Sequence, residues 1–114
     1  MVDSSSNINV VRIHGRDYMT VAGRLELARG HIKSISTEVI PVPDQVVVKA
    51  VIVTDKGAYT GISAANPSKL IERQSPYEVA ETSAVGRALG FAGFGSVEGI
   101  ASAEEMVKAE QTQK

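Results

Sequence analysis

The chain has 114 residues, a formal net charge of −1 at pH 7 and no cysteine. This length fits one domain, and the missing cysteine excludes disulfides, thiolate zinc sites and cysteine nucleophiles. With only three Tyr, two Phe and no Trp, the core must consist mainly of Val, Ile, Leu and Ala.

The two ends of the chain are polar. Residues 1–9 are rich in serine and have no apolar leader core, and no stretch approaches the ~20 apolar residues that a membrane span requires. We therefore expect a cytoplasmic protein with a disordered N-terminus over 1–9, one α+β domain over 10–110 and a frayed tail over 111–114.

A β-hairpin is predicted first. Val10–His14 and Tyr18–Val21 are rich in β-branched residues and flank a turn over Gly15–Asp17. Because Thr20 can also cap a helix, the second segment has an alternative reading, and we favour a strand that ends at Met19.

The helix that follows is predicted to run from Thr20 through Arg29, with Gly30 as its left-handed stop. Its spacing places three apolar residues on one face: Val21, Leu25 and Ala28.

Three antiparallel strands in a meander are predicted next. His31–Ile40 alternates, with Ile35, Thr37 and Val39 on one side, and Pro41 and Pro43 should end it. Gln45–Thr54 is a β-branched run typical of a central strand. A tight turn over Asp55–Gly57 leads to the third strand, Ala58–Ala64.

Two capped helices complete the chain. Ser75 as N-cap, Pro76 at the first position and Glu78 at the third predict a long helix to about Ala92. A single helical turn over 68–72 is an option in the connection before it. A second capping box, at Ser102 to Glu105, predicts a short helix over 103–110.

The long helix carries a stripe of minimal side chains: Thr82, Gly86, Gly90 and Gly93. Mid-helix glycines cost about 1 kcal/mol each relative to alanine, so close packing on the sheet or on a second subunit, or close approach of a ligand, must offset them. From the stripe and the modest core we predict a homo-oligomer, which light scattering would test.

The run Tyr77–Gly95, continued by Gly99–Glu105, resembles phage and prophage single-strand annealing proteins of the essential-recombination-function family. It is similar, more distantly, to the annealing domain of the eukaryotic double-strand-break repair protein. The resemblance implies a three-stranded antiparallel meander packed by a long helix, with an N-terminal strand and helix and a short C-terminal helix. It further implies rings or arcs that bind and anneal single-stranded DNA in recombination and repair, without nucleotide hydrolysis. Of the three basic helix positions in the eukaryotic relative, this chain matches only Arg87.

Charge is distributed unevenly, with an excess of three bases over residues 10–75 and an excess of three acids beyond them. A polyanion should therefore meet the first two thirds of the chain. The candidate DNA contacts are Arg29, Lys33, Lys49, Lys56, Arg87 and Tyr59.

Three of these candidates have specific arguments. Arg87 has a guanidinium suited to phosphate, or alternatively pairs with Glu81 or Glu98. Lys49 interrupts an apolar strand and should reach solvent or an anion, and Tyr59 is the best aromatic for contacting a base.

Catalytic and metal sites are not indicated. His14, Asp17 and His31 lack a ligand spacing, and the carboxylates form no pair suited to acid–base or two-metal chemistry. We expect no enzyme and no cofactor. The alternative function is an oligomeric structural or partner-binding module of the same fold that does not bind DNA.

Overall fold

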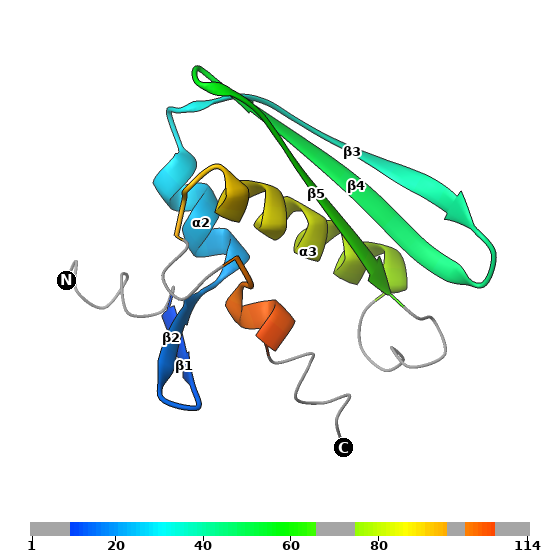
Figure 1. The fold of residues 1–114 in the computed structure, drawn as a ribbon, viewed down its shortest axis with the longest axis horizontal. Helices are drawn as coiled ribbons and strands as arrows, with labels where there is room; N and C mark the ends of the chain where they lie inside the picture. Colours follow the sequence, from blue (N-terminus) through cyan, green and yellow to red (C-terminus); the bar gives the residue numbers. More distant parts are fainter. Residues whose placement is uncertain (1–9, 66–74, 96–99, 107–114) are drawn as a thin grey trace.

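A computed structural model describes residues 10–65, 75–95 and 100–106. It has the predicted α+β fold, in which a three-stranded antiparallel sheet packs against a long helix (Figure 1). The elements are β1 (Val10–Ile13), β2 (Arg16–Met19), α2 (Val21–Ala28), β3 (Ile32–Val42), β4 (Gln45–Thr54), β5 (Gly57–Ala65) and α3 (Pro76–Phe91). A short helix over residues 103–106 follows.

The N-terminal hairpin pairs β1 with β2 through a two-residue turn. His14 and Gly15 form this turn with φ values of 51° and 79°, the left-handed conformation that the commonest two-residue hairpin turns require. The predicted turn over Gly15–Asp17 was therefore placed too late, and Arg16 already belongs to β2.

Helix α2 begins and ends as its caps predicted. The Thr20 hydroxyl accepts a hydrogen bond from the backbone N–H of Gly23 at 3.0 Å, and Gly30 follows the helix with φ of +90°. The predicted inward face was partly wrong, because Leu25 is 36% exposed whereas Arg24 is fully buried.

Strand β3 continues past the predicted end at Ile40, through Pro41 to Val42. The sheet order β3-β4-β5 makes β3 an edge strand. A proline without N–H is tolerated there because one side of an edge strand has no partner strand.

Strand β4 lies at the centre and alternates strictly between buried and half-buried residues from Val46 to Thr54. The buried side chains of β4 face α3. Gly61 and Ala65 of β5, which pair with Ala50 and Val46, lie on the same face. Helix α3 turns three alanines toward this face, Ala80, Ala84 and Ala88, all fully buried. The opposite face of the sheet, here called the open face, is covered by no described element (Figure 1).

The two middle residues of the small-residue stripe of α3, Gly86 and Gly90, pack within the chain. A Cβ added at Gly86 would lie 2.6 Å from the Cγ2 of Val21, and one at Gly90 would lie 2.9 Å from an Arg24 nitrogen. Both glycines therefore admit α2 and its side chains at close range. Close packing does offset them, but the packing partner is α2 and not the sheet or a second subunit as predicted. These two glycines no longer argue for a homo-oligomer, whose existence stays a prediction.

The second capping box is present as predicted. The Ser102 hydroxyl accepts from the N–H of Glu105 at 3.4 Å, and the Glu105 carboxylate accepts from the N–H of Ser102 at 3.2 Å. The short helix and the hairpin share a second small core around Ile13, Tyr18 and Ala103. The predicted turn over 68–72, the tails over 1–9 and 111–114 and the helix beyond residue 106 lie outside the described residues.

Among the described residues, no helix is long and apolar enough to cross a membrane.

The start of α3 allows a direct stability test. The Ser75 side chain accepts a hydrogen bond from the Tyr77 N–H at 3.1 Å, with Pro76 at the first helical position. Ser75→Ala should therefore lower the free energy of unfolding by about 1 kcal/mol. Urea denaturation would measure this, and an unchanged midpoint would show that the cap contributes nothing.

Candidate nucleic-acid interface

Three exposed bases gather where α2 ends, β3 begins and β4 turns into β5. Arg29 is the C-cap of α2, Lys33 is the second residue of β3, and Lys56 lies in the β4–β5 turn. The register brings these segments together, because Ile32 pairs with Thr54. Figure 1 shows the α2–β3 connection and the β4–β5 turn at the same end of the sheet. We call Arg29, Lys33 and Lys56 the basic end.

Local hydrogen bonds hold the backbone of the basic end. The Thr54 hydroxyl accepts from the N–H of Lys56 at 3.1 Å and donates to the carbonyl of Gly57 at 3.4 Å. The N–H of His31 donates to the carbonyl of Ala28 at 2.8 Å. The pairing of β3 with β4 shifts register between Ile32 and Ser34. Lys33 therefore occupies an extra position at a bulge, a feature that redirects a side chain.

Acidic neighbours offset part of this charge. Arg29 forms an ion pair with Glu26 at 3.0 Å, and both side chains are more than half exposed. Asp55 precedes Lys56 in the turn. Three bases against two acids leave a small positive excess, and exposed pairs of this kind contribute only about 0–1 kcal/mol. Arg29 can therefore exchange its carboxylate for a phosphate at little cost.

Lys49 lies apart from the basic end, in the middle of β4 on the open face. Its neighbours in register are Glu38 on β3 and Ile62 on β5. Thr54 lies five positions farther along β4, about 16 Å along a strand. The half-buried lysine thus lies on the solvent side of the sheet, as its polarity predicted, but it does not extend the basic end.

Arg87 is engaged within the chain. Its guanidinium lies 3.6 Å from the Glu105 carboxylate and 5.7 Å from the centre of the Phe91 ring. The ion-pair alternative was therefore right in kind, with Glu105 as the partner. Glu81, one of the two expected partners, instead accepts a hydrogen bond from the Thr37 hydroxyl at 2.7 Å.

Tyr59 points to the face of β5 that α3 covers. It pairs with Ile52, whose side chain is fully buried in the core, and is itself half-buried. Tyr59 and Lys49 therefore lie on opposite faces of the sheet. The structure joins three of the six candidate residues at the basic end. Tyr59 follows the same β4–β5 turn but lies half-buried on the covered face, and Lys49 and Arg87 lie on other parts of the molecule.

Arg24 is the residue that sequence reasoning missed. It is fully buried in α2 and donates to the carbonyls of Gly86 in α3, at 2.6 Å, and Ala101, at 3.1 Å. Burial lowers the pKa of its guanidinium. The negative charges of Glu105 and Glu104 act in the opposite direction and raise this pKa, and the positive charge of Arg87 lowers it further. The sequence did indicate its position, because Arg24 lies three residues after Val21 and four before Ala28. This spacing places all three residues on the inner face of α2.

The fold and the basic end define a class: an α+β domain whose core is a helix, three antiparallel strands and a helix, with cations gathered at one end of the sheet. The chain belongs to the Slr1353 N-terminal dsRNA-binding domain-like family, whose model matches residues 28–92, more than half of the chain. The match spans the end of α2, the sheet and α3. No curated protein and no solved structure matches the chain. The family membership points to nucleic acid as the kind of partner.

This finding corrects the resemblance to single-strand annealing proteins, which was wrong. The order of a helix, three strands and a long helix does not discriminate, because this chain has that order and belongs to a different family. Of the glycines in the Tyr77–Gly95 run, Gly86 and Gly90 are explained by their contacts with α2, and Gly93 and Gly95 by their positive φ values of 96° and 73°. Arg87, the one basic position that supported the resemblance, pairs with Glu105.

Proposed function

We propose that this chain binds nucleic acid through the basic end, without catalysing a reaction, and that its preferred ligand is double-helical RNA. The observation that carries the proposal is the convergence of Arg29, Lys33 and Lys56 at one end of the sheet. The family membership supports the same ligand class.

A duplex suits the basic end better than a single strand. Sequence-independent binding of single strands uses aromatic side chains on which bases stack, and Tyr59 is half-buried on the covered face of the sheet. Duplex RNA is recognised mostly by shape and by contacts to phosphates and 2′-hydroxyls. Three exposed cations on short loops and a strand end match that requirement.

The binding should be weak and salt-dependent. Phosphate contacts release counterions, so three contacts predict a slope of log K against log salt of roughly −2 to −3. A net charge of −1 for the whole chain offers little additional long-range attraction.

Replacing Lys33 and Lys56 together by alanine should weaken binding to a 20-base-pair RNA duplex about tenfold and reduce the salt slope by roughly two. Fluorescence anisotropy at 50 and 200 mM salt measures both quantities. A duplex DNA and a single-stranded DNA of the same length, run in parallel, test the ligand preference. Melting curves of the variant confirm that the fold is retained.

Lys49→Ala and Arg87→Ala are the comparison variants, because the sequence alone nominated both residues. With the ligand at the basic end, each should change the affinity less than twofold. If Lys49→Ala instead lowered the affinity for the RNA duplex more than the double variant does, the ligand would lie on the open face and the proposed site would be overturned.

The alternative is a structural or partner-binding module that does not bind nucleic acid. It is favoured by the ion pairs of Arg12 with Asp17, Arg29 with Glu26 and Arg87 with Glu105, which occupy three of the arginines. No binding of any of the three nucleic acids at 20 mM salt would select this alternative.

A further inference from the structure

Strand β3 is an edge strand, and two of its helix-facing side chains are largely exposed. Ile35 and Val39 are 43% and 53% exposed, although their neighbours in register, Ile52 and Val48, are 0% and 2% exposed. The cause is the position of α3, which packs on β4 and β5. The sheet thus extends beyond the helix on the β3 side.

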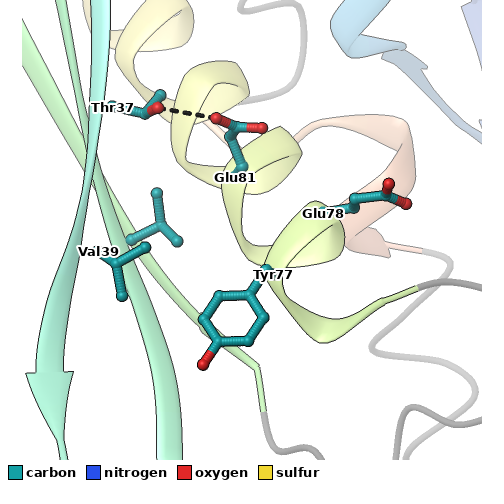
Figure 2. Close-up of a pocket in the computed structure, with 6 residues that line it drawn as sticks. Thr37, Val39, Tyr77, Glu78 and Glu81 are labelled. Atoms are coloured by element: carbon teal, nitrogen blue, oxygen red, sulfur yellow. Dashed lines mark hydrogen bonds between the residues drawn. The ribbon is translucent and has the colours of Figure 1, made fainter.

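A groove of about 140 Å³ lies between β3 and the first turns of α3. Its lining residues are Thr37, Val39, Val48, Tyr77, Glu78 and Glu81. Figure 2 shows Thr37 and Val39 on the strand side, with Tyr77 and Glu81 on the helix opposite them and the Glu78 side chain directed away from the strands. The groove therefore has an apolar floor, an aromatic wall and one carboxylate, that of Glu81, turned toward the strand.

These groups together select a cation on an aliphatic stem. Val39 and Val48 can pack against methylene groups, and Tyr77, which is 54% exposed, offers a ring face to a cation. The hydrogen bond from Thr37 at 2.7 Å orients the Glu81 carboxylate. Among the described residues, no lysine, arginine or histidine lines the groove, so the charge of these residues repels phosphate and attracts a Lys or Arg side chain.

We propose that the β3 edge binds an extended, basic peptide segment of a partner protein as a fourth strand, with a Lys or Arg side chain inserted into this groove. Strand addition to an exposed edge obtains affinity from backbone hydrogen bonds and specificity from pockets for alternate side chains. The bulge at Lys33 and the missing N–H of Pro41 bound the segment available for pairing, Ser34–Ile40. If the Lys of the peptide lies beside Thr37, the peptide residues two positions before and after it lie beside Ile35 and Val39. β-Branched residues fit at these two peptide positions.

A second copy of the chain is a poorer occupant. Two antiparallel β3 edges related by a two-fold axis keep the same face of each sheet on the same side. The acids of both grooves, Glu78 and Glu81 in each copy, would then lie on one side of the joined sheet, and the groove residues that the structure describes include no base to balance them. Such repulsion acts against self-association and in favour of a basic partner.

The test titrates the full chain with the acetylated, amidated peptide TVTKTVT and with its matched control TVTETVT, and follows backbone amide shifts by NMR. The Lys peptide should bind at least tenfold more tightly than the Glu peptide, with shifts concentrated at residues 34–40. The double variant Glu78→Lys/Glu81→Lys should reverse this preference.

Val39→Lys and Ile62→Lys form a matched pair, because both side chains are 53% exposed and lie on the two opposite edge strands. Val39→Lys should lower the affinity for the Lys peptide at least tenfold, and Ile62→Lys should change this affinity less than twofold. Equal binding of the two peptides, no shifts at millimolar peptide or shifts confined to β5 would overturn the proposal. The proposal would also be overturned if light scattering showed that the chain is a homodimer and that the Val39→Lys variant is a monomer.

Discussion

Replacing Arg24 by alanine should lower the free energy of unfolding by about 3–5 kcal/mol, the loss typical of a disrupted buried charge network. Its guanidinium donates to the carbonyls of Gly86 and Ala101, and truncation would leave both oxygens without this donor. It would also open a cavity where the side chain is now fully buried, which adds to the cost. Urea denaturation followed by circular dichroism measures the change.

Arg29→Ala is the control for this prediction. Arg29 is the C-cap of the same helix, but its side chain is 77% exposed and forms an ion pair with the exposed Glu26. Its removal should change stability by no more than about 0.5 kcal/mol. Equal losses from the two variants would show that the buried hydrogen bonds of Arg24 contribute nothing beyond an ordinary surface arginine.

Gly61→Ala should cost about 3 kcal/mol or more, at the upper end of what an overpacked core site loses. A Cβ at this position of β5 would lie 2.2 Å from the carbonyl oxygen of Ala84 and 2.6 Å from the backbone nitrogen of Ala88. Both atoms belong to the backbone of α3, so the whole helix would have to move away from the sheet. Thermal unfolding would measure the loss as a large fall in Tm.

Gly86→Ala provides the graded comparison. The added Cβ would lie 2.6 Å from Val21 Cγ2, a methyl group that can move farther than a helix backbone. Alanine also stabilises a helix by about 1 kcal/mol relative to glycine. The net effect should remain within about 1 kcal/mol, and a larger loss for Gly86→Ala than for Gly61→Ala would contradict the backbone contact described for β5.

The candidate site was only partly predictable, because side chains far apart in sequence meet through the register of strands. Arg29, Lys33 and Lys56 were each nominated by charge, but their meeting depends on the pairing of Ile32 with Thr54. Charge alone gave equal weight to Lys49, which the same register places on the open face. The family could not be assigned from the Arg87 region, since close helix packing explains its glycines without reference to DNA.

The sequence by itself determined the order of the elements and most of their ends. Caps and stops are local: Thr20, Ser75 and Ser102 bond to backbone N–H groups two or three residues ahead. The β-branched run of β4 likewise needs no distant information to form a central strand.

Only the tertiary structure decided which faces became buried. The period of two in the sequence shows that Ile35 and Val39 lie on the same face of the strand. Whether these side chains are buried depends on where α3 packs on the sheet. Gly61 lets the helix backbone approach β5, and the resulting position leaves the β3 edge exposed. Arg24 is buried for a related reason, because glycines on α3 admit its helix closely enough for carbonyls to replace water around the charge.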